Sequence, residues 1–176
     1  MVPLRDGATA QSVAGEPDET LLAFAPALLQ AQAPDRAGRF YSAADYHALY
    51  RSGEATPSQV AEALLPLVQR GQDPPSPYEL AWVASNVDDV RAAARASTER
   101  WAAGKPLGIL DGVPIGVKCD LDVKGYVSSV GMKVDPAHPF FRPAQTTAWP
   151  VQKLQQAGVV VIGHNNMHEI GMGTSS

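Results

Sequence analysis

The sequence is poor in cysteine, in net charge and in long apolar runs, and each shortage excludes a class of protein. Cys119 is the single cysteine among 176 residues, so an internal disulfide is excluded, which suits a reducing compartment. The net charge of -4 at pH 7 argues against nucleic acid or an anionic membrane as the main partner. No apolar run could span a bilayer, and the short run at residues 21–29 follows acidic residues instead of the basic stretch of a signal peptide. We therefore expect a cytoplasmic protein.

What is present is typical of a globular protein with one domain. Hydrophobic residues make up 45% and charged residues 18% of the chain, whose 176 residues are enough to bury a core. Residues 1–38 are rich in Ala, Gly, Pro and Gln and have little hydrophobic periodicity, so we expect a flexible tail with one short helix near residues 21–32. Residues 39–176 are expected to form the domain.

Helix start and stop patterns occur three times in the first half of this domain. Ser42 and Asp45 are spaced as a capping pair, and the helix that they begin should end at Gly53. A second capping residue, followed by proline at the first helical position, predicts a helix over residues 57–71. A third helix is expected over residues 86–104.

From residue 106 the pattern changes from helical to alternating strand and helix. Residues 113–117 and 159–162 are predicted strands, and residues 146–157 between them have the pattern of a helix if Pro150 lies in its first turn. A strand, a helix and a strand in succession predict a crossover between neighbouring strands. The sequence thus predicts an α/β protein in which helices precede the first strands of a mixed sheet, one side of which lacks its partners.

The first of these strands ends on Lys118, after the glycine-flanked stretch Asp-Gly-Val-Pro-Ile-Gly-Val that begins at Asp111. A lysine that closes an apolar strand can be held where water is scarce, and its free amine then becomes available as a base. More commonly such a lysine is a solvated charge at a sheet edge. The sequence blocks on either side of Lys118 decide between these two interpretations.

Four sequence blocks, in a fixed order, accompany Lys118. They are residues 111–118, Asp-Val-Lys-Gly at 122–125, Leu-Gln-Gln-Ala-Gly followed by Val-Val-Val-Ile-Gly at 154–163, and His-Asn-Asn-Met-His-Glu-Ile-Gly at 164–171. Together they resemble the amidase signature family. The resemblance implies the N-terminal segment of the amidase signature fold, and a hydrolase that breaks carboxylic amide C–N bonds with a Ser–cis-Ser–Lys triad in which Lys118 is the lysine. It implies a small-molecule amide as substrate and neither a metal nor a cofactor.

The two serines of that triad belong to family motifs that this sequence does not contain, Gly-Gly-Ser-Ser-Gly-Gly and Gly-Gly-Ser-(Ile/Val)-Arg. The resemblance therefore implies an incomplete domain, whose active site is completed by the remainder of the same polypeptide or by a second chain. It also places residues 128–131 near the active-site cleft, together with three candidate substrate-binding residues, Thr174, Ser175 and Ser176. Turn formation is the alternative explanation for these serines.

Two other functions remain open. A truncated, non-catalytic amidase-like protein would bind a partner or have no activity, and its exposed strand edges would favour association. A chain like the A subunit of an amidotransferase acting on misacylated tRNA would share the triad. Such a chain would need an ammonia donor and a tRNA-facing partner, which the acidic balance of the sequence disfavours.

Several residues depart from the family pattern or suggest other chemistry. Cys119 stands where the family most often has aspartate, and Asp120 follows one place later. A buried, inert thiol is favoured over a nucleophile, because no partner base is apparent. His164 and His168 have the spacing of a metal pair on one helical face, but they lack the His-Glu-x-x-His order and a third ligand, so no metal is expected. Glu169 is expected to hydrogen-bond backbone and fix its loop.

Overall fold

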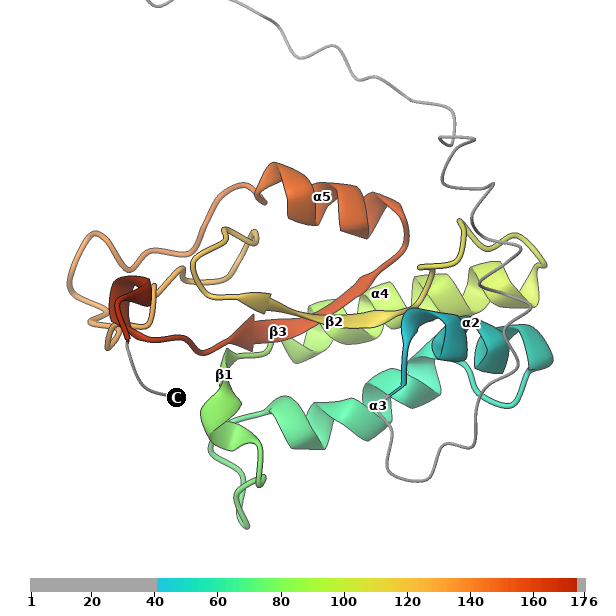
Figure 1. The fold of residues 1–176 in the computed structure, drawn as a ribbon, viewed down its shortest axis with the longest axis horizontal. Coiled ribbons are helices and arrows are strands. Elements are labelled where there is room, and N and C mark those ends of the chain that lie inside the picture. The colour runs from blue at the N-terminus through green and yellow to red at the C-terminus, as the bar shows by residue number, and fades with distance from the viewer. Residues whose placement is uncertain (1–40, 174–176) are drawn as a thin grey trace, which may run out of the picture. The chain divides into compact units, whose positions relative to one another are not determined.

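The computed structural model of this chain describes residues 41–173. The predicted tail at residues 1–38 with its short helix, and the candidate residues Thr174, Ser175 and Ser176, lie outside the described residues. Within the described part, four α-helices and a sheet of three strands form an α/β arrangement with helices on both faces of the sheet (Figure 1). None of the helices described there combines the length and the hydrophobicity needed to span a bilayer.

Helix α2 (Ala43–Ser52) begins and ends where the sequence predicts. The Ser42 hydroxyl accepts a hydrogen bond from the Asp45 N–H at 3.3 Å, and the Asp45 carboxylate accepts one from the Ser42 N–H at 2.8 Å, which completes a capping box. Gly53 ends the helix with a φ of 76°, a left-handed conformation that glycine adopts without steric cost. Local interactions therefore set both ends of α2.

Helix α3 (Pro57–Val68) begins as predicted after Thr56, whose hydroxyl accepts a hydrogen bond from the Gln59 N–H at 3.2 Å. It ends before the predicted limit, because Gln69 is already in an extended conformation. Leu67 is 37% exposed, so the buried face of α3 is the one that carries Ala61, Leu65 and Val68.

Helix α4 (Val87–Ala102) follows Asn86 and packs against α3, which confirms the third predicted helix. The Ser58 N–H donates a hydrogen bond to Oγ1 of Thr98 at 3.0 Å and ties the first turn of α3 to α4. Val90 and other small apolar side chains fill the contact between the two helices. Helices α3 and α4 form one layer beside the sheet (Figure 1).

The three strands of the sheet are ordered β1-β3-β2. Strands β2 (Pro114–Lys118) and β3 (Val160–Asn165) are parallel and are connected through helix α5 (Trp149–Gln156), which confirms the predicted crossover. Pro150 lies in the first turn of α5, where its missing N–H interrupts no helical hydrogen bond. Strand β1 (Trp82–Ala84) pairs antiparallel with β3 and makes the sheet mixed.

Strand β3 lies in the middle of the sheet and is buried on both faces. Val160 and Ile162 pack with α3 and α4, whereas Val161 packs with Val117 and Val151 on the α5 side. Figure 1 shows α5 on one side of the sheet and α3 and α4 on the other. A strand enclosed in this way is apolar along most of its length, which explains the run of residues that predicts β3.

The pairing of β2 with β3 contains a bulge. Ile115 pairs with Val161, but the next residue of β2 pairs with Gly163, so Ile162 is an extra residue on β3. The extra residue reverses the alternation of faces that follows it. His164 consequently packs on the α5 side, against a tyrosine of the cluster found there.

Asp111, at the head of the stretch that leads to Lys118, is a structural residue. Its fully buried carboxylate accepts hydrogen bonds from Arg100 at 2.8 and 2.6 Å, from the Ser97 hydroxyl at 2.7 Å and from the Leu107 N–H at 2.9 Å. Burial alone would raise the pKa of Asp111, but these hydrogen bonds and the charge of Arg100 hold that pKa below its ordinary value. The carboxylate therefore ties the segment before β2 to α4.

Candidate functional site

Lys118 ends strand β2, in register with Asn165 of β3. Its side chain is 54% exposed, and its Nζ lies 3.0 Å from Oδ2 of Asp120. The amine is therefore at the surface and beside a carboxylate, and not in the dry position that the strand pattern would allow. The physical reason is that β2 is an edge strand within residues 41–173, with β3 as its partner there.

Cys119 separates the two charged residues and faces the interior. Its side chain is fully buried, its N–H donates to the Asn165 carbonyl at 3.1 Å, and its carbonyl accepts from the Val130 N–H at 3.1 Å. The thiol is therefore buried, as favoured from the sequence, and has no access to a substrate in this structure. The two hydrogen bonds fix the peptide that carries Lys118 and Asp120.

Two loop segments, residues 128–131 and residues 167–173, lie side by side next to this strand end. The Ile170 N–H donates to the Val130 carbonyl at 2.8 Å, and the Val130 N–H is the donor that reaches the carbonyl of Cys119. A continuous set of backbone hydrogen bonds thus connects the residue after the lysine to both loops. The candidate substrate-binding residues follow the second loop directly but lie outside the described part of the chain.

Backbone strain is concentrated at the contact between these loops. Val130 and Ile170, which share the hydrogen bond, both have a φ of 52°. Non-glycine residues seldom adopt this left-handed conformation, and β-branched residues least of all. Such strain persists only where the surrounding structure enforces it, and it occurs preferentially at functional sites.

Asn165 is a polar residue of this strand end that the sequence pattern did not single out. Its side chain lies over Gly116, where a Cβ would stand 2.8 Å from the amide carbon of Asn165. Because glycine within a strand often marks a close approach, Gly116 is the sequence feature from which this contact could have been predicted. The amide thus lies over the β2 residue two places before Lys118.

His164, a candidate metal ligand by its spacing, is a core residue. It is fully buried, its ring centroid lies 4.7 Å from that of Tyr126, and neither ring nitrogen has a hydrogen-bond partner of good geometry among the described residues. Burial lowers the pKa of His164, although the backbone of Val127 and the charges of Asp122 and Asp120 oppose this effect. The imidazole is therefore neutral at neutral pH.

His168 and Glu169 follow strand β3, so His164 and His168 do not share a helical face. Residues 41–173 contain no group of three or more His, Cys, Asp or Glu side chains placed to hold a metal ion. Glu169 begins the short 3-10 turn η2 (Glu169–Gly171) and is exposed. Its expected hydrogen bond to backbone is absent within the part of the chain that the structure describes.

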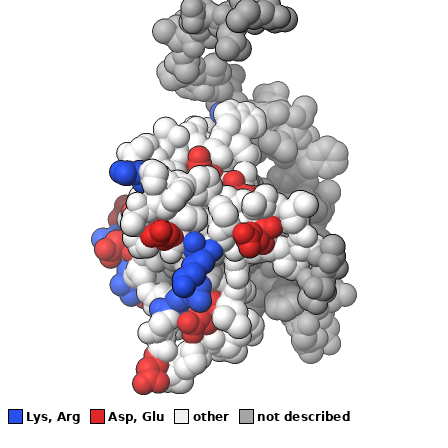
Figure 2. Space-filling view, turned by 90° about the vertical axis from the view of Figure 1, so that its left-hand side faces the viewer, with Lys and Arg blue, Asp and Glu red and all other residues white. Residues whose placement is uncertain are grey.

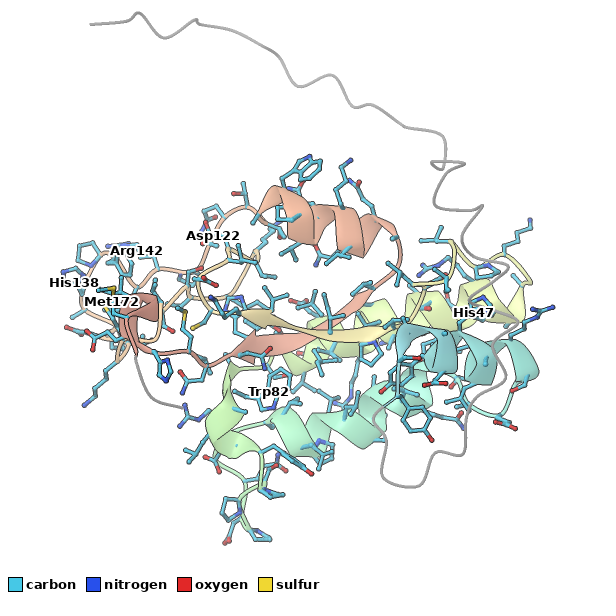
Figure 3. All side chains as sticks on the ribbon, in the orientation of Figure 1. His47, Trp82, Asp122, His138, Arg142 and Met172 are labelled. Atoms are coloured by element: carbon cyan, nitrogen blue, oxygen red, sulfur yellow. The ribbon has the colours of Figure 1, made fainter. Side chains whose placement is uncertain are left out.

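The surface at this end of the molecule is mixed in character. Figure 2 shows basic and acidic side chains next to one another on this face. Figure 3 shows His138, Arg142 and Met172 together where the loops after β2 and β3 lie. Met172 is 79% and Ile170 61% exposed. Large apolar side chains exposed beside polar ones are typical of surfaces that contact further polypeptide.

Known proteins that are similar to this chain are named as amidases, amide hydrolases or amidotransferase subunits. A family model described as Amidase matches residues 77–176. The chain is 38% identical over 139 residues to a fatty acid amide hydrolase of Medicago truncatula, a match that covers 78% of this chain and 22% of that protein. It is 32% identical over 136 residues to the A subunit of the glutamyl-tRNA(Gln) amidotransferase of Lachnospira eligens, covering 77% of this chain and 27% of that protein.

Solved structures agree with the sequence matches. The native peptide amidase from Stenotrophomonas maltophilia superposes with a TM-score of 0.61 at 27% identity, over 73% of this chain and 25% of that one. A bacterial aryl acylamidase belonging to the amidase signature enzymes superposes with a TM-score of 0.59 at 27% identity, over 74% of this chain and 26% of that one. The chain thus spans between 22% and 27% of the length of these four proteins.

Proposed function

This chain belongs to the amidase signature family, and from that membership we propose that it contributes Lys118, as general base, to the hydrolysis of carboxylic amides. The observation that carries the proposal is the position of Lys118 at the end of β2, accessible and next to the strained contact between residues 128–131 and 167–173. A general base must be accessible to the hydroxyl whose proton it accepts. The exposed amine of Lys118 meets this requirement.

In the proposed reaction the amine of Lys118 takes a proton from a bridging serine, which takes one from a nucleophilic serine. The nucleophile's oxygen bonds to the amide carbon, and backbone N–H groups stabilise the oxyanion. The C–N bond then breaks, and the proton returns from Lys118 through the bridging serine to the leaving nitrogen. Water attacks the acyl ester, which releases the acid and restores the serine hydroxyl.

The two serines are proposed to lie on polypeptide beyond this sequence, since neither family motif occurs in it. That polypeptide is a continuation of the chain or a second chain. The exposed side chains of Ile170 and Met172, beside the strand end that carries Lys118, support contact with further polypeptide there. Thr174, Ser175 and Ser176 are proposed to line the substrate site, because they follow residues 167–173 directly.

The relatives named fatty acid amide hydrolase make long-chain primary amides the first substrates to test. A second candidate function, that of the A subunit of an amidotransferase, is favoured by the relatives that carry that name, one of them at 32% identity. It requires an ammonia donor and a tRNA-facing partner. The net charge of -4 and the interspersed charges of Figure 2 give it less support than amide hydrolysis.

An affinity tag at the N-terminal end of the chain isolates it from its source cells together with any polypeptide that completes it. Ammonia release from oleamide is then measured for the wild type, for Lys118→Ala and for the control Lys105→Ala, which removes an exposed lysine after α4. We expect Lys118→Ala to lower kcat/KM on the order of a thousandfold and Lys105→Ala to leave it unchanged.

Full activity in Lys118→Ala would overturn the proposal. A wild type that releases no ammonia from oleamide or from glutamine, and no p-nitroaniline from p-nitroacetanilide, would instead identify a non-catalytic amidase-like chain. Ammonia release from glutamine that depends on a copurified partner and on tRNA would favour the amidotransferase.

A further inference from the structure

Asp120 is a neighbour of Lys118 to which the proposed reaction gives no part. Its Oδ2 lies 3.0 Å from Nζ of Lys118. Asp122, the next carboxylate along the chain and labelled in Figure 3, accepts a hydrogen bond from the Ser128 hydroxyl at 2.6 Å instead. Among residues 41–173, Asp120 is therefore the carboxylate with which the amine is paired.

The backbone around Cys119 explains why the pair forms. The Cys119 side chain is fully buried, and both its N–H and its carbonyl are hydrogen-bonded, to Asn165 and Val130. Cys119 and Asp120 lie in a turn that follows β2 and is closed by a hydrogen bond from the Leu121 N–H to the Lys118 carbonyl at 3.0 Å, and this turn brings the Asp120 carboxylate beside the Lys118 amine. A carboxylate at position 119 would enter the interior, whereas one at position 120 meets the amine.

We propose that Asp120 is a positioning residue for Lys118, an inference that rests on the proposed amide hydrolysis. An exposed lysine has a long, flexible stem and loses much rotamer freedom when it is held in one place. The contact between Nζ and Oδ2 of Asp120 holds the amine in one place, from which it can reach the hydroxyl whose proton it accepts. Once that proton is bound, the carboxylate lies beside the new positive charge and stabilises it.

The pairing itself is tested on the chain alone, by NMR relaxation of the Cε methylene in lysine-labelled protein, with Lys118→Arg used to assign the resonance. Lys118 should become clearly more mobile in Asp120→Asn and return toward the wild-type value in Asp120→Glu, which keeps the charge. Equal mobility of Lys118 in the wild type and in Asp120→Asn overturns the proposal, since no pair would then exist in solution.

The positioning is tested by kinetics on the tagged protein with the polypeptide that completes it. We expect Asp120→Asn to lower kcat for oleamide about tenfold while KM changes less than about twofold, because the amine is misplaced and substrate binding is not. Asp120→Glu should recover most of kcat. The control Glu54→Gln removes one exposed carboxylate in the turn between α2 and α3 and should change neither constant.

The outcomes separate this inference from the function on which it rests. An inactive Lys118→Ala together with an unchanged kcat in Asp120→Asn would overturn the positioning role alone. A fully active Lys118→Ala would overturn the proposed function and the positioning role with it. A purely structural role of Asp120 would lower the melting temperature of Asp120→Asn without the split between kcat and KM, which also counts against positioning.

Discussion

Arg100 and Asp111 form a two-point ion pair beside the start of the sheet. The guanidinium Nε and Nη2 donate to the two carboxylate oxygens at 2.8 and 2.6 Å, and the Asp111 side chain is fully buried. Arg91 and Glu62 form a second two-point pair, at 2.6 and 2.9 Å, which lies exposed on α4 and α3. The chain therefore contains two arginine–carboxylate pairs of similar geometry, one with a buried carboxylate and one with both partners exposed.

Removing the buried charge should cost far more stability than removing the exposed one. Asp111→Asn leaves the guanidinium and the Leu107 N–H without their charged acceptor, so we expect it to lower the free energy of unfolding by about 3 kcal/mol. Glu62→Gln should change that free energy little, because water replaces the lost interaction. Urea unfolding of both variants checks this, and equal effects would contradict it.

Acid should destabilise the fold through His164. Because burial lowers the pKa of His164 in the folded protein from its ordinary 6.5, the unfolded chain takes up the proton first as the pH falls. The contribution of His164 to the free energy of unfolding is therefore fully present above about pH 6.5 and declines below it, toward the lower pKa of the folded state.

The variant His164→Phe keeps a ring against Tyr126 and removes the titrating group. Urea unfolding between about pH 7 and about pH 5 should show a flatter pH dependence for this variant than for the wild type. The exposed His138 supplies the control, since His138→Gln should retain the wild-type slope. A wild-type slope in His164→Phe would assign the acid sensitivity to another group.

Gly116→Ala should disturb the strand end by collision with one side chain. The added Cβ would overlap the amide of Asn165, so we expect a loss of about 1 to 3 kcal/mol in the free energy of unfolding. The same substitution in an Asn165→Ala background should cost less than about 0.5 kcal/mol, because the colliding group is gone. A double-mutant cycle by urea unfolding measures the difference, and equal costs in both backgrounds would refute the contact.

Gly131→Ala should loosen the contact between the two loops. Gly131 has a φ of +77°, and its Cβ would lie 2.6 Å from the backbone oxygens of Met167 and His168, which a side-chain rotation cannot relieve. Gly71→Ala is the matched control, with a φ of +74° and nothing within 4 Å of its Cβ.

We expect Gly71→Ala to cost about 1 kcal/mol from the left-handed backbone alone and Gly131→Ala about 2 kcal/mol more. Hydrogen exchange of the Ile170 amide, which is bonded to Val130, should accelerate in Gly131→Ala only. The same exchange rate in both variants would mean that the loops do not depend on this close approach.

The Cys119 thiol should be unreactive in the native protein. Its side chain is fully buried, so a thiol reagent such as DTNB should label it only after unfolding in urea. On the proposed function, Cys119→Ala should accordingly leave amide hydrolysis by the tagged protein unchanged. Fast labelling of the native state would instead reopen the interpretation of Cys119 as a nucleophile.

The helices could be predicted from the sequence because their ends depend on neighbouring residues. Ser42 with Asp45, and Thr56 with Gln59, form their capping boxes within one turn, so the pattern is visible in the chain itself. Strand β1 could not be predicted in this way. It has three residues, and Trp82 acquires its strand conformation by pairing with Asn165, far along the sequence.

The candidate site could likewise be predicted only where it depends on residues that are close together in the sequence. The family blocks identify Lys118, but the pairing of Lys118 with Asp120 depends on which way the Cys119 side chain faces, and hydrogen bonds to Val130 and Asn165 set that direction. The strained contact of Val130 with Ile170 likewise joins residues distant in sequence. Such tertiary contacts cannot be predicted from the identity of single residues, because they depend on which distant segments pack together.

The extra residue Ile162 makes the length of β3 matter more than its composition. Exchange of valine for isoleucine in β3 before Ile162 changes the side-chain volume by one methylene. Deletion of a single residue in the same part of the strand would move every following side chain of β3 to the opposite face of the sheet. The imidazole of His164 would then face α3 and α4, and the amide of Asn165 would enter the cluster around Val161. In relatives of this chain, insertions and deletions within the segment that corresponds to β3 should therefore be far rarer than substitutions there.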